Sequence, residues 1–215
     1  MNSHHAQWTQ QLQTGCAELA LPLSSTQQQQ LLAYLALLER WNRRFNLTAV
    51  RDPATLVPRH LLDSLAILPW VGSGPLLDIG TGAGLPGIPL AILRPDLPCT
   101  LLDTNGKKTR FVRQVTLELG LTNVNVLQQR VEQLPTPPGF AQITARAFTS
   151  LTQLVNLSAP LLVEGGILLA MKGSLPEQEL AQLAQRGGEI TIHPLVVPQL
   201  IGERHLICWR AEGES

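Results

Sequence analysis

A glycine-rich turn flanked by two carboxylates is the part of this 215-residue sequence best suited to bind a ligand. The turn lies in segment 75–89, Pro-Leu-Leu-Asp-Ile-Gly-Thr-Gly-Ala-Gly-Leu-Pro-Gly-Ile-Pro, and contains Gly80, Gly82 and Gly84. Glycine permits positive φ and lets a ligand approach the backbone without meeting a Cβ atom. Asp103 follows about 20 residues later, the separation at which a second strand presents an acid to a ribose diol. The pattern therefore predicts a ligand that contains a nucleoside.

The position of Asp78 helps to decide which nucleoside ligand this is. The run from Gly82 to Gly87 also satisfies the dinucleotide fingerprint, so a nicotinamide or flavin dinucleotide is a rival. Asp78 precedes the first glycine, inside the end of the strand, where its charge would repel a pyrophosphate. S-adenosyl-L-methionine has no phosphate and carries a sulfonium and an ammonium, which a carboxylate tolerates. We therefore expect S-adenosyl-L-methionine, and a tight turn without a ligand is the remaining alternative.

Short apolar strands and helices alternate through the rest of the sequence, which predicts a parallel sheet with this turn at its carboxyl edge. A helix-free return between the last two strands makes one strand antiparallel, an ending typical of class I methyltransferases. We therefore expect an α/β protein with a Rossmann-like, mostly parallel seven-stranded sheet and a C-terminal antiparallel hairpin. Strands are predicted within residues 76–79, 99–103, 124–127, 140–148, 165–173, 189–197 and 204–210.

A helical extension is predicted to precede the sheet. We expect residues 1–70 to form this extension and residues 71–215 to form the methyltransferase domain on which it packs. The run Ser24-Ser25-Thr26 is a plausible cap for a long helix, and we expect the glutamines at 27–30 to be its solvated first turn. Residues 59–65 are predicted to form another helix. Its His60 either satisfies a local hydrogen bond or contacts the cofactor or substrate.

Two basic segments have alternative interpretations. Residues 40–48 interleave three arginines with Trp41 and Phe45, which suits nucleic acid because arginine holds phosphate and aromatic rings stack on bases. The same aromatics are four residues apart and equally form a core-facing helix stripe beside solvated arginines. Residues 107–113 place lysines and arginines at a helix N-terminus, where they oppose the macrodipole. Either an anionic partner offsets that cost or the face is solvated.

Composition limits the class of protein. The formal net charge is zero, so any nucleic-acid surface must be local. Three cysteines lie far apart and form no metal-ligand spacing, which indicates free thiols in a reducing cytosol and no metal. No apolar run is long enough to span a membrane, and the polar start Met1–His5 is unlike a signal peptide. We expect a cytoplasmic monomer.

Seven segments of the chain together resemble the bacterial glucose-inhibited division protein B family, and the resemblance covers nearly the whole chain. The Gly-Leu-Pro-Gly-Ile-Pro run is that family's own form of the methyltransferase glycine loop. Ala83 is a departure, because relatives often have proline there. The segments are Arg43–Thr48, Arg59–Leu65, Asp78–Pro89, Leu101–Asp103, Arg130–Glu132, Arg146–Phe148 and Lys172–Gly173.

The resemblance implies a methyltransferase of 16S ribosomal RNA that acts on guanine N7, at rRNA position 527 in the 530 loop. The substrate is then 16S ribosomal RNA or the small ribosomal subunit. It further implies cofactor contacts at Gly80, Leu85, Val131, Glu132 and Arg146, with Asp103 near the ribose. Asp78, Gly82 and Gly84 complete the predicted cofactor set.

Three basic residues are predicted to serve the reaction. Arg146 ends a strand on the side of the sheet where ligands bind, and we expect it to hold the guanine or its phosphate. Arg130 and Lys172 are expected to hold the RNA backbone. A dinucleotide-dependent oxidoreductase is an alternative, but the only tyrosine, Tyr34, has no Tyr-x-x-x-Lys partner. A cofactor-binding module without catalysis is another alternative.

Overall fold

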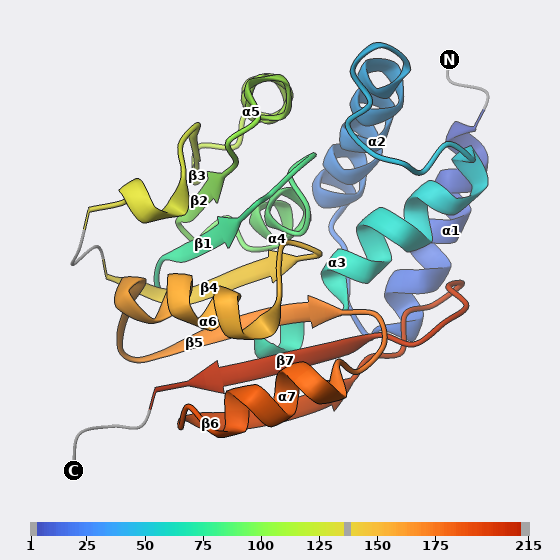
Figure 1. Ribbon diagram of the computed structural model, residues 1–215. Helices are drawn as coiled ribbons and strands as arrows, with labels where there is room; N and C mark the ends of the chain where they lie inside the picture. The colour runs from blue at the N-terminus through green and yellow to red at the C-terminus, as the bar shows by residue number, and fades with distance from the viewer. Residues whose placement is uncertain (1–3, 136–138, 212–215) are drawn as a thin grey trace.

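The computed structural model describes residues 4–135 and 139–211 of the chain (Figure 1). The first three residues of the polar start lie outside this range. The strands are β1 Leu76–Ile79, β2 Cys99–Leu102, β3 Val124–Leu127, β4 Phe140–Arg146, β5 Leu162–Lys172, β6 Glu189–Pro194 and β7 His205–Arg210. The α-helices are α1 His5–Glu18, α2 Ser25–Phe45, α3 Asp63–Leu65, α4 Gly87–Leu93, α5 Gly106–Leu119, α6 Leu151–Ser158 and α7 Glu177–Ala184. Short helical turns are η1 Pro53–Thr55, η2 Val57–Leu62, η3 Leu68–Trp70, η4 Val131–Gln133 and η5 Ala159–Leu161.

Seven strands form one sheet in the order β3-β2-β1-β4-β5-β7-β6. The pairs among β1 to β5 are parallel, and β7 runs antiparallel to both β5 and β6. Strand order therefore reverses between β1 and β4, the point at which doubly wound sheets bind ligands. The predicted α/β class, with a mostly parallel sheet and an antiparallel ending, is confirmed.

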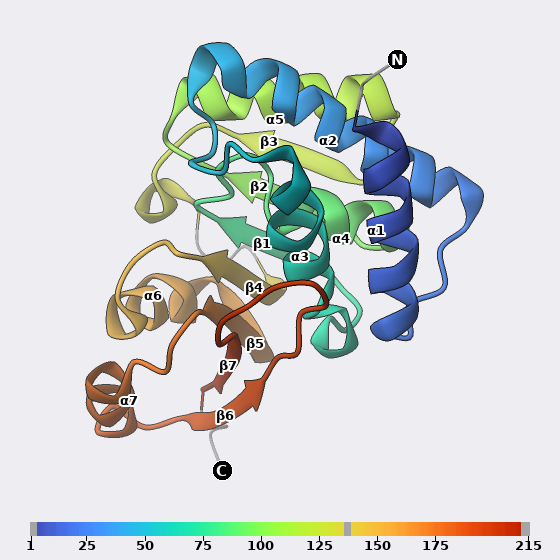
Figure 2. The ribbon, with the colours of Figure 1, turned by 90° about the vertical axis from the view of Figure 1, so that its right-hand side faces the viewer.

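Helices cover both faces of the sheet because its central strands are apolar on both sides. Successive residues of β1 show this: Leu76 packs with one buried cluster and Leu77 with the other. Helices α6 and α7 lie on one face in Figure 1, whereas Figure 2 shows α1 to α5 gathered on the other. Both layers leave the carboxyl ends of the parallel strands available for a site.

The N-terminal helices pack directly on the sheet domain. One buried cluster contains Leu35 of α2, Leu61 of η2 and Ile88 of α4, so no solvent layer separates the extension from the core. Figure 2 shows α2 running beside α5, and the ring of Trp41 packs at a tilt against Phe111 of that helix, with 5.6 Å between the ring centroids. Trp41 therefore belongs to the core side of the basic segment. We keep the boundary at residue 70 as a proposal.

Local details of the extension differ from the sequence prediction. Ser24 caps α2 in a reciprocal box with Gln27, as the sequence suggested. The glutamine turn is not simply solvated, because Gln27 donates to the Leu93 carbonyl and Gln30 to the Leu119 carbonyl. These carbonyls belong to the last residues of α4 and α5, where they accept no hydrogen bond from within their own helices. The expected helix at residues 59–65 is a π-helical turn, η2, that continues into α3.

Candidate active site

The turn after β1 is fixed from beneath by Asp78. Its Oδ2 atom accepts hydrogen bonds from Thr81 Oγ1 at 2.6 Å and from the Gly87 amide at 3.0 Å. One carboxylate oxygen therefore ties both ends of the loop to the strand that precedes it. The helix α4 begins at Gly87, and Pro86 is its N-cap.

Burial also changes the acidity of Asp78. The side chain is fully buried, and desolvation raises its pKa from 3.8 to about 7, although hydrogen bonds from Thr81 and Gly87 act in the opposite direction. Its Oδ1 atom has no hydrogen-bond partner within the described chain. This carboxyl group is therefore able to carry a proton near neutral pH.

Tyr34 supports the same loop from the N-terminal extension. This buried side chain donates its hydroxyl to the Ala83 carbonyl at 2.9 Å. Loss of solvent raises the pKa of Tyr34 above its ordinary value, so the phenol stays neutral and remains a donor. Helix α2 thus contributes directly to the geometry of the glycine loop.

Asp103 lies at the end of β2 and faces the loop. Its Oδ2 accepts from the Gly82 amide at 2.9 Å and its Oδ1 from the Asn105 amide at 2.8 Å. Asn105 in turn caps α5 through the Lys107 and Lys108 amides. The carboxylate is held by backbone donors and is directed toward the space above the sheet.

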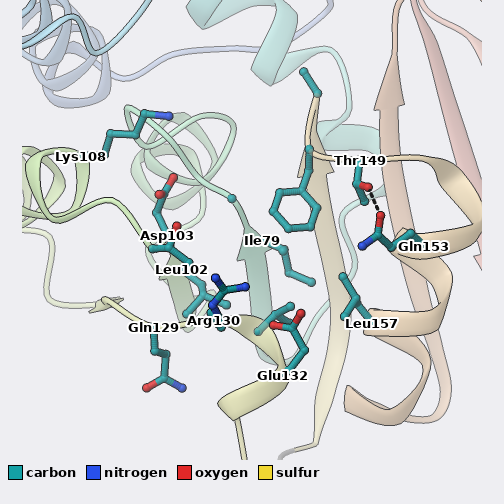
Figure 3. A pocket seen from close by; sticks show the side chains of 15 residues that line it. Ile79, Leu102, Asp103, Lys108, Gln129, Arg130, Glu132, Thr149, Gln153 and Leu157 are labelled. Atoms are coloured by element: carbon teal, nitrogen blue, oxygen red, sulfur yellow. Dashed lines mark hydrogen bonds between the residues drawn. The ribbon is translucent and has the colours of Figure 1, made fainter.

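That space is a pocket of about 510 Å³, here called the first pocket (Figure 3). Its walls come from the ends of β1, β2 and β4, from η4 and from α6. Figure 3 shows Asp103, Arg130 and Glu132 on one side and Thr149, Gln153 and Leu157 on the other. The lining residues are Ile79, Gly80, Leu102, Asp103, Thr104, Lys108, Gln129, Arg130, Val131, Glu132, Ala147, Phe148, Thr149, Gln153 and Leu157.

The ring of Phe148 lies against Gly80 at the edge of the first pocket. A Cβ atom added to Gly80 would stand 2.4 Å from Phe148 Cδ2, and Gly80 has a φ of +67°. Both the backbone conformation and the available space therefore disfavour a side chain here. Phe148 is 42% exposed, an unusual position for a phenylalanine and one that leaves a ring face free.

A second pocket, of about 450 Å³, lies beside the first. Ala147 lines both pockets, so the two meet at the residue that follows β4. The other lining residues of the second pocket are Thr48, Val50, Arg59, His60, Asp63, Arg146, Met171, Lys172, Gly173 and Arg204.

An ion-pair cluster organises the second pocket. Asp63 is 5% exposed, and its Oδ2 accepts from Arg146 Nη1 at 2.9 Å while its Oδ1 accepts from Arg204 Nε at 3.1 Å. Arg146 Nη1 also donates to the Arg59 carbonyl at 3.0 Å. Side chains from α3, β4 and the start of β7 are therefore joined by one carboxylate.

His60 is neutral in this surrounding. Burial lowers its pKa to about 3, and the positive charge of Arg146 adds to that effect. Its Nε2 atom lies 3.1 Å from Thr48 Oγ1. The local hydrogen bond, one of the two expectations for this residue, is present, and His60 also lines the second pocket.

Lys172 is engaged within the protein. Its Nζ donates to the Thr149 carbonyl at 3.1 Å and to Glu179 at 3.2 Å. Glu179 of α7 also accepts from the Leu151 amide at the start of α6. Lys172 therefore holds the loop that borders the first pocket, and any contact with RNA would be in addition to these bonds.

The predicted site residues divide into three groups. The second pocket receives Arg146 and Lys172. Neither pocket is lined by Asp78, Gly82, Gly84 or Leu85, which lie under or within the loop, with Leu85 only 4% exposed. The first pocket receives Gly80, Asp103, Arg130, Val131 and Glu132.

Asp63, Arg204 and Phe148 also belong to these pockets, although no individual role was expected for them from the sequence. The two arginines bound to Asp63 stand 83 and 141 residues away from it, so no local pattern signals the cluster. Within the described residues, no group of three or more histidine, cysteine, aspartate or glutamate side chains is arranged to hold a metal. No helix in the same part of the chain is long and apolar enough to cross a membrane.

Comparison with known sequences identifies one family. Its profile, described as rRNA small subunit methyltransferase G (GidB), matches residues 27–207. A protein from Marinobacter nauticus named ribosomal RNA small subunit methyltransferase G is 54% identical over 203 residues, covering 94% of this chain and 95% of its own length. A protein of the same name from Alkalilimnicola ehrlichii is 50% identical over 204 residues, covering 95% and 93%.

Comparison with solved structures identifies the fold. The glycopeptide N-methyltransferase MtfA in complex with S-adenosyl-L-methionine matches with a TM-score of 0.62 at 12% identity, over 72% of this chain and 88% of its own. A S-adenosylmethionine-dependent methyltransferase from Aquifex aeolicus matches with a TM-score of 0.56 at 19% identity, over 74% and 93%. The [4+2]-cyclase SpnF matches at 0.60 and 16% identity, over 90% and 99%, which shows that the fold alone does not define a reaction.

Proposed function

The chain belongs to the rRNA small subunit methyltransferase G family, and from this premise we propose that it transfers a methyl group from S-adenosyl-L-methionine to N7 of a guanine in 16S ribosomal RNA. The guanine at rRNA position 527 is the proposed target. The observation that carries the proposal is the first pocket, where the glycine loop at Gly80 and the oriented carboxylate of Asp103 lie together at the point where strand order reverses.

The residues of this pocket fit S-adenosyl-L-methionine. A Cβ atom would fill the cradle at Gly80, and Asp103 offers acceptor oxygens suited to a ribose diol. Val131 and Glu132 are proposed to border the adenine, with Asp78, Gly82, Gly84 and Leu85 shaping the loop. The carboxylates also suit a cationic ligand better than a pyrophosphate. Arg146 lies in the neighbouring pocket, so we propose that it contacts the methyl-donor end of the cofactor.

The proposed reaction needs little acid–base chemistry from the protein. The bound cofactor supplies an electrophilic methyl group, and the electron pair of the broken carbon–sulfur bond remains on sulfur. Neutral guanine N7 carries a lone pair and no proton, so no general base is required. His60 stays neutral and is hydrogen-bonded to Thr48, in keeping with a site that acts by positioning.

Three basic side chains are proposed to hold the RNA. Arg146 is assigned to the guanine or its phosphate, Arg130 to the backbone at the rim of the first pocket, and Lys172 to the backbone beside the second. A base must leave its stack to reach such a site, so the substrate is a single-stranded or extruded guanine. Lys172 would act mainly through the loop that it holds at Thr149.

The same proposal has consequences for the cellular location, the oligomeric state and the partner of the protein. The three cysteines, Cys16, Cys99 and Cys208, are buried free thiols, which suits the reducing cytoplasm where ribosomes assemble. We propose a cytoplasmic monomer that meets 16S ribosomal RNA or the small subunit. A hydride-transfer role finds no support at Tyr34, because its hydroxyl is bonded to the Ala83 carbonyl.

Labelled methyl transfer tests the proposal. Small ribosomal subunits from a strain without this gene are incubated with the protein and tritiated S-adenosyl-L-methionine, and the RNA is digested to nucleosides. The proposal predicts label in 7-methylguanosine, and loss of at least 90% of that label with Arg146→Ala. Label in another nucleoside, or none, would contradict it.

A further inference from the structure

Asp63 is the meeting point of three parts of the chain that are remote in sequence. Its carboxylate is almost fully buried and divides its two oxygens between Arg146 and Arg204. The arginine side chains themselves are 24% and 27% exposed and line the second pocket. The cluster is thus closed on the side of Asp63 and open on the side of the pocket.

Each guanidinium retains donors for a ligand. A guanidinium has five N–H groups, and Arg146 uses the two on Nη1 for Asp63 and the Arg59 carbonyl. Arg204 uses Nε for Asp63 and one Nη1 hydrogen for the Glu203 carbonyl. Three N–H groups on each arginine have no acceptor among the described residues. Such planar donor sets suit phosphate and the carbonyl oxygen of guanine.

Asp63 also limits the positive charge of the second pocket. The cluster of two arginines and one carboxylate carries a single net positive charge, and Arg59, which also lines the pocket, adds a second. His60 adds none because burial keeps it neutral, and Lys172 is paired with Glu179. This balance matters for methylation at N7, since the base gains a positive charge as its lone pair forms the new bond. Two guanidinium groups without a carboxylate would oppose that change.

We propose that the second pocket is the subsite for the acceptor nucleotide and that Asp63 is its positioning residue, holding the two arginines and offsetting their charge. The inference rests on the proposed function. Ala147 lines both pockets, so a base in the second lies next to a methyl donor in the first. Asp63 itself need not touch the RNA, because it acts through Arg146 and Arg204.

Steady-state kinetics of Asp63→Asn tests the proposal, with small subunits that lack the methyl group as substrate. Asparagine keeps the size of the side chain and removes its charge. We expect kcat to fall at least tenfold, with the Kd for S-adenosyl-L-methionine within twofold of wild type. The double variant Asp63→Asn with Arg204→Met restores the net charge and is expected to regain at least threefold in kcat over Asp63→Asn. Asp96→Asn removes a carboxylate from the exposed pair with Arg94 and is the matched control.

Three results would overturn the inference: full kcat in folded Asp63→Asn, an equal loss in the affinity for S-adenosyl-L-methionine, or a double variant no better than the single one. If thermal unfolding shows that Asp63→Asn is not folded, the single variant Arg204→Met tests the proposed subsite instead. Arg204→Met leaves the Asp63–Arg146 ion pair in place and should raise the KM for subunits about fivefold. An unchanged KM would contradict the assignment of the second pocket as the acceptor subsite. If wild type itself methylates no subunits, the proposed function fails instead.

Discussion

The Gly82 amide donates a 2.9 Å hydrogen bond to Asp103 Oδ2 across 21 residues of sequence. This bond joins the glycine loop after β1 to the acid after β2, the two features that define the first pocket. The Asp103 carboxylate is therefore oriented before any ligand binds, which reduces the entropy cost of ordering this side chain on binding.

Alanine at Gly80 should prevent cofactor binding. The added Cβ would stand 2.4 Å from Phe148 Cδ2, at a φ of +67° that already costs about 1 kcal/mol for a non-glycine residue. Calorimetry should show at least tenfold weaker binding of S-adenosyl-L-methionine. Gly120→Ala is the matched control, because Gly120 has a φ of +64° but no atom near its Cβ position. Normal affinity in Gly80→Ala would mean that the cradle is not used.

Asparagine at Asp103 should weaken cofactor binding without unfolding the loop. The amide oxygen can still accept one backbone bond, from Gly82 or Asn105, but the charged acceptor for a ribose diol is lost. We expect the Kd for S-adenosyl-L-methionine to rise about tenfold, which corresponds to about 1.4 kcal/mol. Binding as tight as that of wild type would place the ribose elsewhere.

Phenylalanine at Tyr34 should show that the N-terminal extension supports the loop. The substitution removes the donor to the buried Ala83 carbonyl. An unsatisfied buried carbonyl costs roughly 1–3 kcal/mol, so the free energy of unfolding should fall by about that amount in urea titrations. A loss of affinity for S-adenosyl-L-methionine of about threefold should accompany it. Unchanged stability and unchanged affinity would show that the N-terminal extension does not support the glycine loop.

Asparagine at Asp78 should change how stability depends on pH. The folded pKa is raised to about 7 from an ordinary value of 3.8, so the stability associated with the protonated group is present below pH 3.8 and is lost as pH rises to 7. The difference in pKa corresponds to an upper bound of about 4 kcal/mol. Wild type should therefore lose stability relative to Asp78→Asn between pH 4 and 7 in urea titrations. Parallel profiles would show that Asp78 ionises normally.

The sequence was informative where chemistry is local. Glycines that need positive φ, an acid at a fixed distance and a helix cap at Ser24 each follow from neighbours along the chain. Strand alternation was equally readable, and the seven-stranded sheet formed in the predicted class. These features depend on backbone geometry and periodicity, which a single sequence displays directly.

Long-range pairing was not readable from the sequence. Asp63 meets Arg204, 141 residues away, only after the sheet has brought β7 beside β5. The glutamine turn of α2 looked solvated because its acceptors, the ends of α4 and α5, arrive through tertiary packing. Side-chain partners that depend on topology carry no local signal, and Asp63 was missed for that reason.

The first pocket should bind a cationic methyl donor and not a dinucleotide. Calorimetric titration of the wild-type protein with S-adenosyl-L-methionine and, separately, with NADH distinguishes these ligands. We expect saturable binding of S-adenosyl-L-methionine with one site per chain and no measurable heat from NADH. Tight binding of NADH together with no binding of the sulfonium compound would refute this assignment of the pocket.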